Sequence, residues 1–368
     1  MSTNRPNNIA FDVRELSGQP AGVGRIISSL INAIRETSPG IGLTLIGDSP
    51  TAPAGVQGDY IGIRTSGLAW HIKCAKLLKN NPQWKTYVSA RSPLVPIMAP
   101  DRSVYFVNDL ISFKHPEYFT LKTRVMSRLF VKLALGRANR IVAISHSTAR
   151  DIERISPGAD KRTTVVYLAA DPVFSPGPPD PEVLRMLDLP DRYILTVGTI
   201  EPRKNHLSLI RAYEDLPGKL KAGYGLVMVG KRGWKCERIM QGIKRMEAGG
   251  NLRYLEYIGD ADLAQVYRGA SLFVYPSIYE GFGLPVLEAM SCGVPVITSN
   301  NSSLPEVGGD AVIYIDPGNA ADIANAMTYV LENDETAKHM SGAGIIRSNQ
   351  FTWEKTAADI LKMIDTRS

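Results

Sequence analysis

Two glutamates enclose a short glycine-rich stretch in the second half of the chain. In "YEGFGLPVLE", Glu280 and Glu288 stand on either side of "GFGLPVL". The apolar run "SLFVYP" precedes this stretch and a helical pattern follows it, so the sequence predicts a turn from a strand into a helix. Glycines let the backbone approach a ligand, and carboxylates near the N–H groups of a first helical turn can hold sugar hydroxyls. The alternative is that Glu280 caps the helix and Glu288 is a surface acid.

Two adjacent cations follow another predicted strand. In "GTIEPRKNHLSLI", Pro202 turns the chain and brings Arg203 and Lys204 to the start of the next helix. Two cations, reinforced by the helix dipole, would bind a diphosphate and stabilise its charge as it leaves. Adjacent basic residues are also common on solvent-exposed loops, so this alternative stays open for the pair taken alone.

A third glycine-rich turn lies near the start of the chain. In "SGQPAGVGRIISSL", Gly22 and Gly24 follow the first predicted strand and precede a helix. This arrangement suits backbone amides that approach a phosphate. The spacing is not GxGxxG, and a turn needed only for packing is the alternative.

Short β-rich runs alternate with helical patterns along the whole chain. The runs are continuously apolar, which is typical of parallel sheets that helices cover on both faces. The fold class is therefore predicted as α/β, with two doubly wound, Rossmann-like domains. The predicted strands are "IAFDV", "LTLIG", "TYVSA", "VYFVN", "RIVAIS" and "TTVVY" before residue 170, then "YILTVG", "YGLVMVG", "LRYLEYIG", "SLFVYP", "VPVITS" and "AVIYI".

A proline-rich segment separates the two series of strands. The stretch "DPVFSPGPPDP" can neither pair as a strand nor continue as a helix, so it predicts a linker. The predicted parts are an N-terminal domain (1–170), the linker (171–192), a C-terminal domain (193–350) and a C-terminal helix (351–368). That helix, with Thr352 as its N-cap, is expected to pack back on the N-terminal domain. Two such domains would enclose a ligand cleft at the carboxyl ends of both sheets.

Composition and charge restrict the classes of protein. With 44% hydrophobic and 21% charged residues the chain is globular, and no apolar run is long enough to span a bilayer. The start lacks the pattern of a secretory signal, so a cytoplasmic protein is expected. The three cysteines, Cys74, Cys236 and Cys292, lie far apart and are expected to be buried thiols.

The basic residues concentrate in the first half. Residues 1–168 hold 22 Lys and Arg against 11 Asp and Glu, whereas residues 169–368 hold 20 against 25. Within 120–150 there is no acidic residue, and Leu121, Val125, Leu129 and Leu133 recur every fourth residue, which predicts an amphipathic helix. Lys122, Arg124, Arg128 and Lys132 would lie off this apolar stripe. They form either the solvated face of a packed helix or a surface that binds an anionic membrane or a lipid diphosphate. Nucleic acid is not expected as a partner, because the sequence shows neither a set of aromatic residues arranged for base stacking nor a helix-turn-helix or zinc pattern.

The motifs together resemble a known family. "PRKN", followed by "YEGFGLPVLEAMSCGVPVITSN" and "SLPEVGGDAV", is similar to glycosyltransferase family 4, whose members are retaining enzymes of the GT-B fold. "EGFGLPVLE" matches the family signature of two glutamates separated by seven residues. The stretch "SNNSSLPEVGGDA" most resembles bacterial mannosyltransferases of polysaccharide assembly, which implies GDP-mannose as the donor.

The resemblance implies a role for each motif residue. Glu288 would hold the ribose of the nucleotide, and Arg203 and Lys204 would bind the diphosphate beside the Gly22 to Gly24 loop. The leaving diphosphate would help to deprotonate the acceptor on the face from which it departs, so the anomeric configuration is kept and neither a metal nor another cofactor is required. The donor sugar would be held by Glu280 and by the backbone of Gly281, Phe282, Gly283 and Leu284.

One position departs from the family pattern. Family members commonly carry a His-Asp pair after the strand matched here by "VYFVN", but this chain has Asn108 followed by Asp109. Asn can hydrogen-bond a sugar hydroxyl or a phosphate, but it cannot carry a proton at neutral pH. His115 and His146 lie nearby in the sequence, where helix-start or surface positions are expected. Asp262 in "GDADL" fits a helix N-cap better than a metal ligand.

These observations predict a retaining glycosyltransferase that moves a hexose, expected to be mannose from GDP-mannose, to a saccharide on a polyprenyl diphosphate. The enzyme would bind the inner membrane peripherally through its basic N-terminal domain. Other GT-B enzymes that use nucleotide sugars, such as a UDP-sugar transferase, a phosphorylase or an epimerase, are the alternative within enzymes. A non-catalytic nucleotide-sugar sensor is the alternative outside them, and Asn108 favours it.

Overall fold

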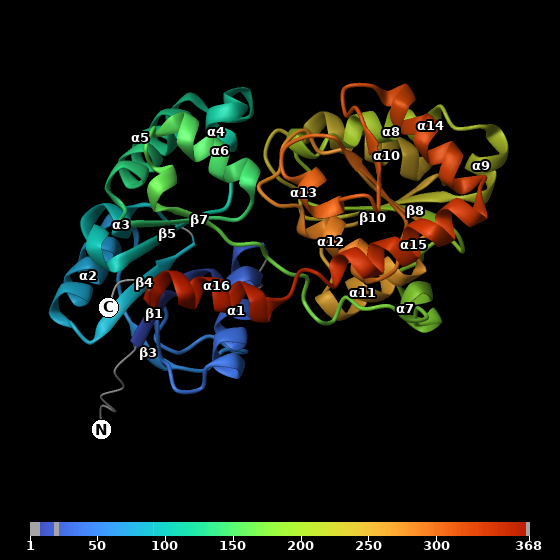
Figure 1. The fold of residues 1–368 in the computed structure, drawn as a ribbon. Helices are drawn as coiled ribbons and strands as arrows, with labels where there is room; N and C mark the ends of the chain where they lie inside the picture. Colours follow the sequence, from blue (N-terminus) through green and yellow to red (C-terminus); the bar gives the residue numbers. More distant parts are fainter. Residues whose placement is uncertain (1–7, 18–21, 91, 366–368) are drawn as a thin grey trace. The chain divides into compact units, whose positions relative to one another are not determined.

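A computed structural model of the protein describes residues 8–17, 22–90 and 92–365. The chain divides into two compact units. Unit 1 comprises Met1–Leu168 together with Thr352–Ser368, and unit 2 comprises Ala169–Phe351. Each unit has its own parallel sheet, so the prediction of two doubly wound α/β domains is confirmed (Figure 1).

In the described part of unit 1, seven parallel strands form one sheet in the order β3-β2-β1-β4-β5-β6-β7. The interior of β1 is apolar because both faces of the sheet are covered there, and every residue of this strand is buried. The order reverses between β1 and β4, which makes their carboxyl ends a switch point of the sheet. The strands are β1 (Asn8–Asp12), β2 (Gly42–Gly47), β3 (Asp59–Gly62), β4 (Trp84–Ser89), β5 (Ser103–Val107), β6 (Arg140–Ala143) and β7 (Thr163–Val165).

Helices cover both faces of this sheet. Ala10 packs in one cluster with Trp70 and Cys74 of α2, whereas its neighbours Ile9 and Phe11 point to the opposite face and are also buried. Within unit 1, α1 packs on α16, and α3 packs on both α2 and α5. The helices are α1 (Val23–Thr37), α2 (Gly67–Asn80), α3 (Leu94–Met98), α4 (Ile111–Lys114), α5 (Leu121–Arg137), α6 (His146–Ile155) and α16 (Trp353–Asp365).

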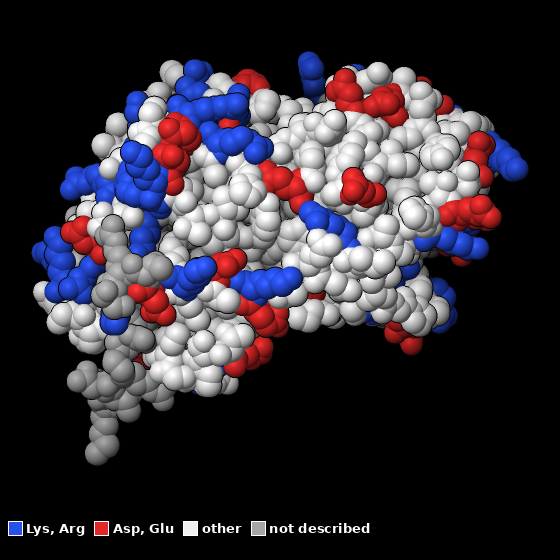
Figure 2. All heavy atoms as spheres, in the orientation of Figure 1, with Lys and Arg blue, Asp and Glu red and all other residues white. Residues whose placement is uncertain are grey.

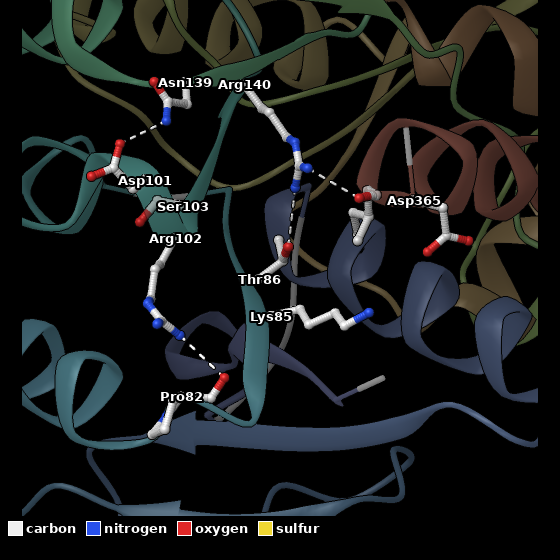
Figure 3. Close-up of a pocket in the computed structure, with 10 residues that line it drawn as sticks. Pro82, Lys85, Thr86, Asp101, Arg102, Ser103, Asn139, Arg140 and Asp365 are labelled. Atoms are coloured by element: carbon white, nitrogen blue, oxygen red, sulfur yellow. Dashed lines mark hydrogen bonds between the residues drawn. The ribbon is translucent and has the colours of Figure 1, made fainter. Parts of the chain in front are cut away.

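Helix α16 comes from the far end of the chain and belongs to unit 1. The Thr352 hydroxyl accepts a hydrogen bond from the Lys355 N–H at 3.3 Å, as expected of an N-cap. At the other end, Arg140 donates to the Ile364 carbonyl at 3.0 Å and to the Thr86 hydroxyl at 3.3 Å. These groups line a polar cavity of about 450 Å³ at the amino ends of β4 to β6 (Figure 3). The cavity therefore lies at the edge of the sheet where α16 is anchored, opposite the carboxyl ends of the strands.

In the described part of unit 2, six parallel strands follow the order β10-β9-β8-β11-β12-β13. The order reverses between β8 and β11, so this sheet also has a switch point. The strands are β8 (Tyr193–Val197), β9 (Gly225–Val229), β10 (Leu252–Leu255), β11 (Leu272–Tyr275), β12 (Val296–Ser299) and β13 (Ile313–Ile315). The helices are α7 (Pro181–Met186), α8 (His206–Glu214), α9 (Gly218–Gly223), α10 (Glu237–Ala248), α11 (Asp260–Gly269), α12 (Leu284–Ser291), α13 (Leu304–Gly308), α14 (Ala320–Leu331) and α15 (Asp334–Ser348).

The proline-rich segment differs from the predicted linker at 171–192. It belongs to unit 2, and it contains the short helix α7 because the Asp180 side chain caps the Glu182 N–H and Pro181 takes the first helical position. Arg268 of α11 fixes the segment by donating to the Ser175 carbonyl at 2.8 Å and to the Val173 carbonyl at 3.2 Å. The sequence predicted no helix in this proline-rich segment, and that prediction was wrong at α7.

Two further expectations concern composition. In the part of the chain that the structure describes, no helix has the length and apolar character needed to cross a bilayer. The three cysteines are free thiols; Cys74 and Cys292 are buried, but Cys236 is half-buried at the start of α10.

Candidate functional site

The loops after β8 and β11 meet at the switch point of unit 2. The first loop carries Arg203 and Lys204, and the second carries Glu280. Their backbones are joined, since the Ile278 N–H donates to the Arg203 carbonyl at 2.9 Å and the Ser277 hydroxyl donates to the same carbonyl at 3.2 Å. The two motifs that the sequence singled out therefore form one site.

The cation pair lies on a single 3₁₀ turn before helix α8. Pro202 begins this turn because its missing N–H costs nothing there, and Asn205 ends it in the left-handed conformation with φ at 59°. Helix α8 begins only at His206. The cations therefore stand on the preceding turn, one step earlier than the sequence suggested, with their side chains directed at the β11 loop.

Glu280 is the centre of a dense ionic cluster. Its Oε2 lies 2.6 Å from Arg203 Nη1, and its Oε1 lies 2.6 Å from Lys204 Nζ. Two hydroxyls also donate to Oε1, from Ser277 at 2.6 Å and from Tyr275 at 2.8 Å. Lys204 additionally donates to the Tyr275 hydroxyl. One carboxylate thus accepts four hydrogen bonds, two of them from cations, which is an arrangement that fixes its position.

The surroundings of Glu280 shift the pKa values of the whole cluster. Burial alone would raise the pKa of Glu280, but the charges of Arg203 and Lys204 and the hydrogen bonds from Lys204 and Ser277 outweigh it and lower this pKa to about 2. Burial, aided by the charge of Arg203, lowers the pKa of Lys204. Burial and the Glu280 charge raise the pKa of Tyr275 well above its usual value, so Tyr275 stays a hydrogen-bond donor.

A second carboxylate, which sequence reasoning missed, neutralises the pair. Glu201 is 1% exposed, and its Oε1 lies 2.7 Å from Arg203 Nη2. With both glutamates ionised, two negative charges balance the two cations. A diphosphate that binds here would therefore need stabilisation from other groups as well, and the amino end of helix α12, which follows the β11 loop, is one candidate.

The loop from Gly281 to Leu284 leads into α12 through a strained glycine. Gly283 has φ at 114°, and a Cβ atom at this position would lie 2.8 Å from Leu304. Gly283 is the N-cap of α12 and has no side chain with which to pair the first N–H groups. The Ser303 hydroxyl holds the loop by donating to the carbonyls of Glu280 at 3.0 Å and Phe282 at 2.7 Å. The Phe282 ring is buried against Phe351, so a ligand would meet the backbone of this residue.

Glu288 lies on α12 and is almost completely buried, with 2% of its surface exposed. The Tyr267 hydroxyl donates to its Oε2 at 3.0 Å. The Tyr267 ring in turn packs edge-on against Phe174 of the proline-rich segment. Glu288 is therefore not a surface acid, and the segment first taken for a linker supports its hydrogen-bond partner.

The remaining predicted residues lie in unit 1, at the carboxyl ends of its strands. Gly22 is the N-cap of α1 with φ at 45°, whereas Gly24 is buried inside that helix. The neighbouring positions 18–21 lie outside the described residues. Asn108 follows β5 and donates through Nδ2 to the Ala90 carbonyl at 2.7 Å, while its buried Oδ1 has no partner among the described residues. The exposed Asp109 accepts a hydrogen bond from the Ile111 N–H at 3.2 Å, just before α4, whose N-cap is Leu110.

The histidines and the acidic "GDADL" stretch occupy ordinary structural positions. His115 pairs with Glu117 at 3.0 Å and stacks on Tyr118. His146 is the first residue of α6 and lies exposed. Asp262 lies in the first turn of α11, whose N-cap is Gly259, so the prediction that Asp262 is the cap was wrong. Within the described ranges, no group of acidic, Cys and His side chains has an arrangement that could hold a metal ion.

Four residues that complete the site were visible in the sequence but carried no signal of their own. Glu201 directly precedes the "PRK" motif, whereas Tyr275 and Ser277 stand four and two positions before Tyr279, the first residue of "YEG". Tyr267 has no motif near it. What identifies these residues is their contact with Glu280, Arg203 or Glu288, and such contacts depend on the fold.

Comparisons with known proteins show the family and the fold of the chain. Residues 186–347 match the family described as Glycosyl transferases group 1. An O-antigen chain mannosyltransferase B from Escherichia coli is 38% identical over 258 residues, which cover 69% of this chain and 68% of that protein. A serotype-specific mannosyltransferase, WbdA from Escherichia coli, is 33% identical over 70% of this chain, although the match spans only 32% of that longer protein. Among solved structures, a sucrose-phosphate synthase from Thermosynechococcus elongatus has a TM-score of 0.80 over 97% of this chain and 98% of that chain, at 19% identity, which supports the GT-B fold.

Proposed function

Because the chain belongs to the group 1 glycosyltransferases, we propose that it transfers mannose from GDP-mannose to a saccharide carried on a lipid diphosphate, with retention of anomeric configuration. The relatives named as mannosyltransferases of O-antigen chains support mannose as the sugar and a polysaccharide as the product. The observation that carries the proposal is the cluster of Arg203, Lys204 and Glu280 at the switch point of unit 2.

In the proposed reaction, the donor diphosphate binds beside the cation pair and the amino end of α12. The Arg203 and Lys204 side chains keep 15% and 9% of their surface exposed, and in this proposal the diphosphate meets that exposed part while Glu280 holds both cations in place. Because the cluster is already ordered, the cations need no rearrangement when charge develops on the leaving diphosphate. The backbone from Gly281 to Leu284 contacts the sugar in this proposal, and Glu288 accepts hydrogen bonds from the ribose.

Proton transfer in this proposal does not use a histidine. The leaving diphosphate takes the proton of the acceptor hydroxyl on the face from which it departs, so neither a metal nor another cofactor takes part. Asn108 positions a hydroxyl through its carbonyl oxygen, the atom that lacks a partner among the described residues. No side chain of the protein acts as a general base in this proposal.

The first test identifies the donor. We expect GDP-mannose to raise the melting temperature of the protein more than UDP-glucose, ADP-glucose or dTDP-glucose, because a ligand that binds only the folded state stabilises it by mass action. A larger shift with a UDP-sugar would replace GDP-mannose with that donor and keep the transferase assignment.

The second test measures transfer to a synthetic acceptor that carries a saccharide on a short, water-dispersible lipid diphosphate. Lys204→Gln should lower the rate at least a hundredfold, the loss expected when one preorganised electrostatic contact is removed. Lys219→Gln, an exposed position in the same unit, should leave the rate unchanged. Equal rates for the two variants would refute the role of Lys204, and NMR of the product reports the anomeric configuration.

A nucleotide-sugar sensor is the second candidate, because Asn108 cannot act as a base. Labelled GDP-mannose separates the two functions. Slow release of free mannose in the absence of acceptor indicates an enzyme, whereas tight binding with no turnover, with and without acceptor, indicates the sensor.

A further inference from the structure

Helix α5 exposes most of its large apolar side chains to solvent, whereas a helix packed on a core would bury them. The sequence predicted a stripe of Leu121, Val125, Leu129 and Leu133, and in the structure these side chains and Met126 are 43% to 74% exposed. They make up five of the twelve large hydrophobic side chains that lie exposed among the described residues. Such residues scattered singly are ordinary, but five on one face of one helix form a patch.

The inner side of α5 is held by polar contacts as well as by packing. Arg128 donates to the Ser112 carbonyl at 2.9 Å and to the Phe113 carbonyl at 3.0 Å, and Ser127 donates to the Ser112 hydroxyl at 2.8 Å. Ala134 and Leu135 are the buried apolar residues of the helix. The expectation that Arg128 lies on the solvated side was therefore wrong, because its guanidinium fixes α5 to α4. This anchoring leaves the apolar stripe directed outward.

Basic residues lie within the exposed face. At 100° per residue, Lys122 and Lys132 fall between the leucines, Arg137 falls at the edge, and all three are exposed. The expectation that Lys122 and Lys132 lie off the apolar stripe was therefore wrong. No acidic residue occurs from 120 to 150. The positive charge extends over unit 1, because residues 1–168 hold 22 Lys and Arg against 11 Asp and Glu. Figure 2 shows basic side chains gathered in the region where Figure 1 places α2 and α5.

From this face we infer that α5 docks on an anionic phospholipid surface. The leucines would enter the boundary between headgroups and acyl chains, and the lysine stems would lie along it with their ammonium groups at the phosphates. Because only one face of this 17-residue helix carries the exposed apolar side chains, the helix would lie in the plane of the interface. Charge complementarity favours lipid over a protein partner, because unit 1 is strongly cationic around the patch. The inference extends the proposed function, whose acceptor is lipid-linked, but it stands on the exposed face alone.

The test is flotation of the full chain with vesicles of phosphatidylcholine, with or without 30 mol% phosphatidylglycerol. No donor or acceptor is present, so failure of the transferase assignment would not affect the result. We expect the protein to float with the anionic vesicles and to stay at the bottom with neutral ones. Absence of binding to the anionic vesicles overturns the inference.

Matched variants locate the contact. Val125→Asp with Leu129→Asp should reduce the partition coefficient at least tenfold, and Lys122→Glu with Lys132→Glu should reduce it by about fivefold for each lysine. Ile346→Asp, on an equally exposed apolar residue of α15, and the pair Lys219→Glu with Lys338→Glu, on exposed lysines of unit 2, should bind like the wild type. Because every substituted side chain is exposed, circular dichroism should be unchanged. Equal binding by the α5 variants and these controls refutes the assignment to α5.

Sedimentation velocity without vesicles tests the alternative that a second copy of the chain, and not a membrane, covers α5. A monomer that floats with anionic vesicles supports membrane docking. A dimer that Val125→Asp with Leu129→Asp converts to monomer would show that a second copy covers α5, and would overturn the proposal.

Discussion

Glu280 Oε2 lies 2.6 Å from Arg203 Nη1, although 77 positions separate the two residues in the chain. The sequence suggested a sugar contact for the first and a diphosphate contact for the second. In the structure each is the other's partner, so replacing either one removes a counter-charge from the other. Substitutions in this cluster should therefore alter stability as well as activity, and pH should separate the two effects.

The first prediction concerns Glu280→Gln. The folded pKa of about 2 lies below the reference value of 4.5, so this carboxylate contributes stability that is present above pH 4.5 and is lost as the pH falls toward 2. A difference of this size corresponds to about 3 kcal/mol. In urea unfolding from pH 6 to pH 2.5, the variant should start less stable and lose less. The exposed control Glu36→Gln should show the same pH dependence of the unfolding free energy as the wild type. If Glu280→Gln also showed that pH dependence, the ionic cluster would not be the source of this stability.

The second prediction concerns His206, which is buried beside the cation turn. Burial, reinforced by the Lys204 charge, lowers the pKa of His206 to about 3 from 6.5. Because the unfolded chain takes up the proton first, stability is present above pH 6.5 and is lost as the pH falls toward 3. Between pH 7 and pH 5 this single residue should cost about 2 kcal/mol.

Denaturant titrations of His206→Gln should show a smaller decrease over that interval. His339→Gln, at an exposed histidine of α15, should decline as the wild type does. If His206→Gln declines as steeply as the wild type, the imidazole is protonated in the folded protein.

The third prediction concerns Tyr267→Phe, which removes a hydroxyl donor from the buried Glu288. A hydrogen bond to a charged group contributes about 1.5–3 kcal/mol, and the unfolding free energy should decrease by about that amount. If Glu288 holds the ribose, the melting-temperature shift produced by GDP-mannose should also shrink. Tyr329→Phe, at an exposed tyrosine of α14, is the control for both measurements. If Tyr267→Phe lowered the stability but left the melting-temperature shift with GDP-mannose unchanged, Glu288 would not bind the ribose.

The fourth prediction compares two glycines. Gly283→Ala should destabilise the protein by about 1–3 kcal/mol, because φ at 114° is unfavourable for alanine and its Cβ would contact Leu304. Gly136→Ala should stabilise it by about 0.5–1 kcal/mol, because this position is helical and has open space around it. Thermal unfolding of both variants is the measurement, and the two shifts should have opposite signs.

The strands were predictable because buried parallel strands are continuously apolar. The exception is β3, whose four residues "DYIG" form an edge strand that is exposed or half-buried throughout. Its pattern is too short and too polar to separate from a turn. Periodicity also found α5 but left its orientation open, since the hydrogen bonds from Arg128 to the α4 carbonyls leave no trace in residue spacing.

The candidate site was predictable as two motifs but not as one cluster. Glycine, proline and charge at the ends of apolar runs marked the loops of Arg203 and Glu280. The neutralising role of Glu201 and the support of Glu288 by Tyr267 depend on distances across the sheet, which residue types do not encode. Burial of Lys204 against Tyr275 likewise follows from the strand order, in which β8 and β11 are neighbours.

Helix α16 has a consequence for biosynthesis. Trp353, Ile360 and Ile364 are buried in unit 1, whose other residues are translated before unit 2 begins. On the ribosome, unit 2 can complete its core as soon as residue 351 emerges, whereas the earlier-made unit must wait for 352–365 with part of its apolar surface uncovered. The order of translation is thus the reverse of the order in which the two cores can close, and chaperones that bind nascent chains would meet unit 1 for longer than unit 2.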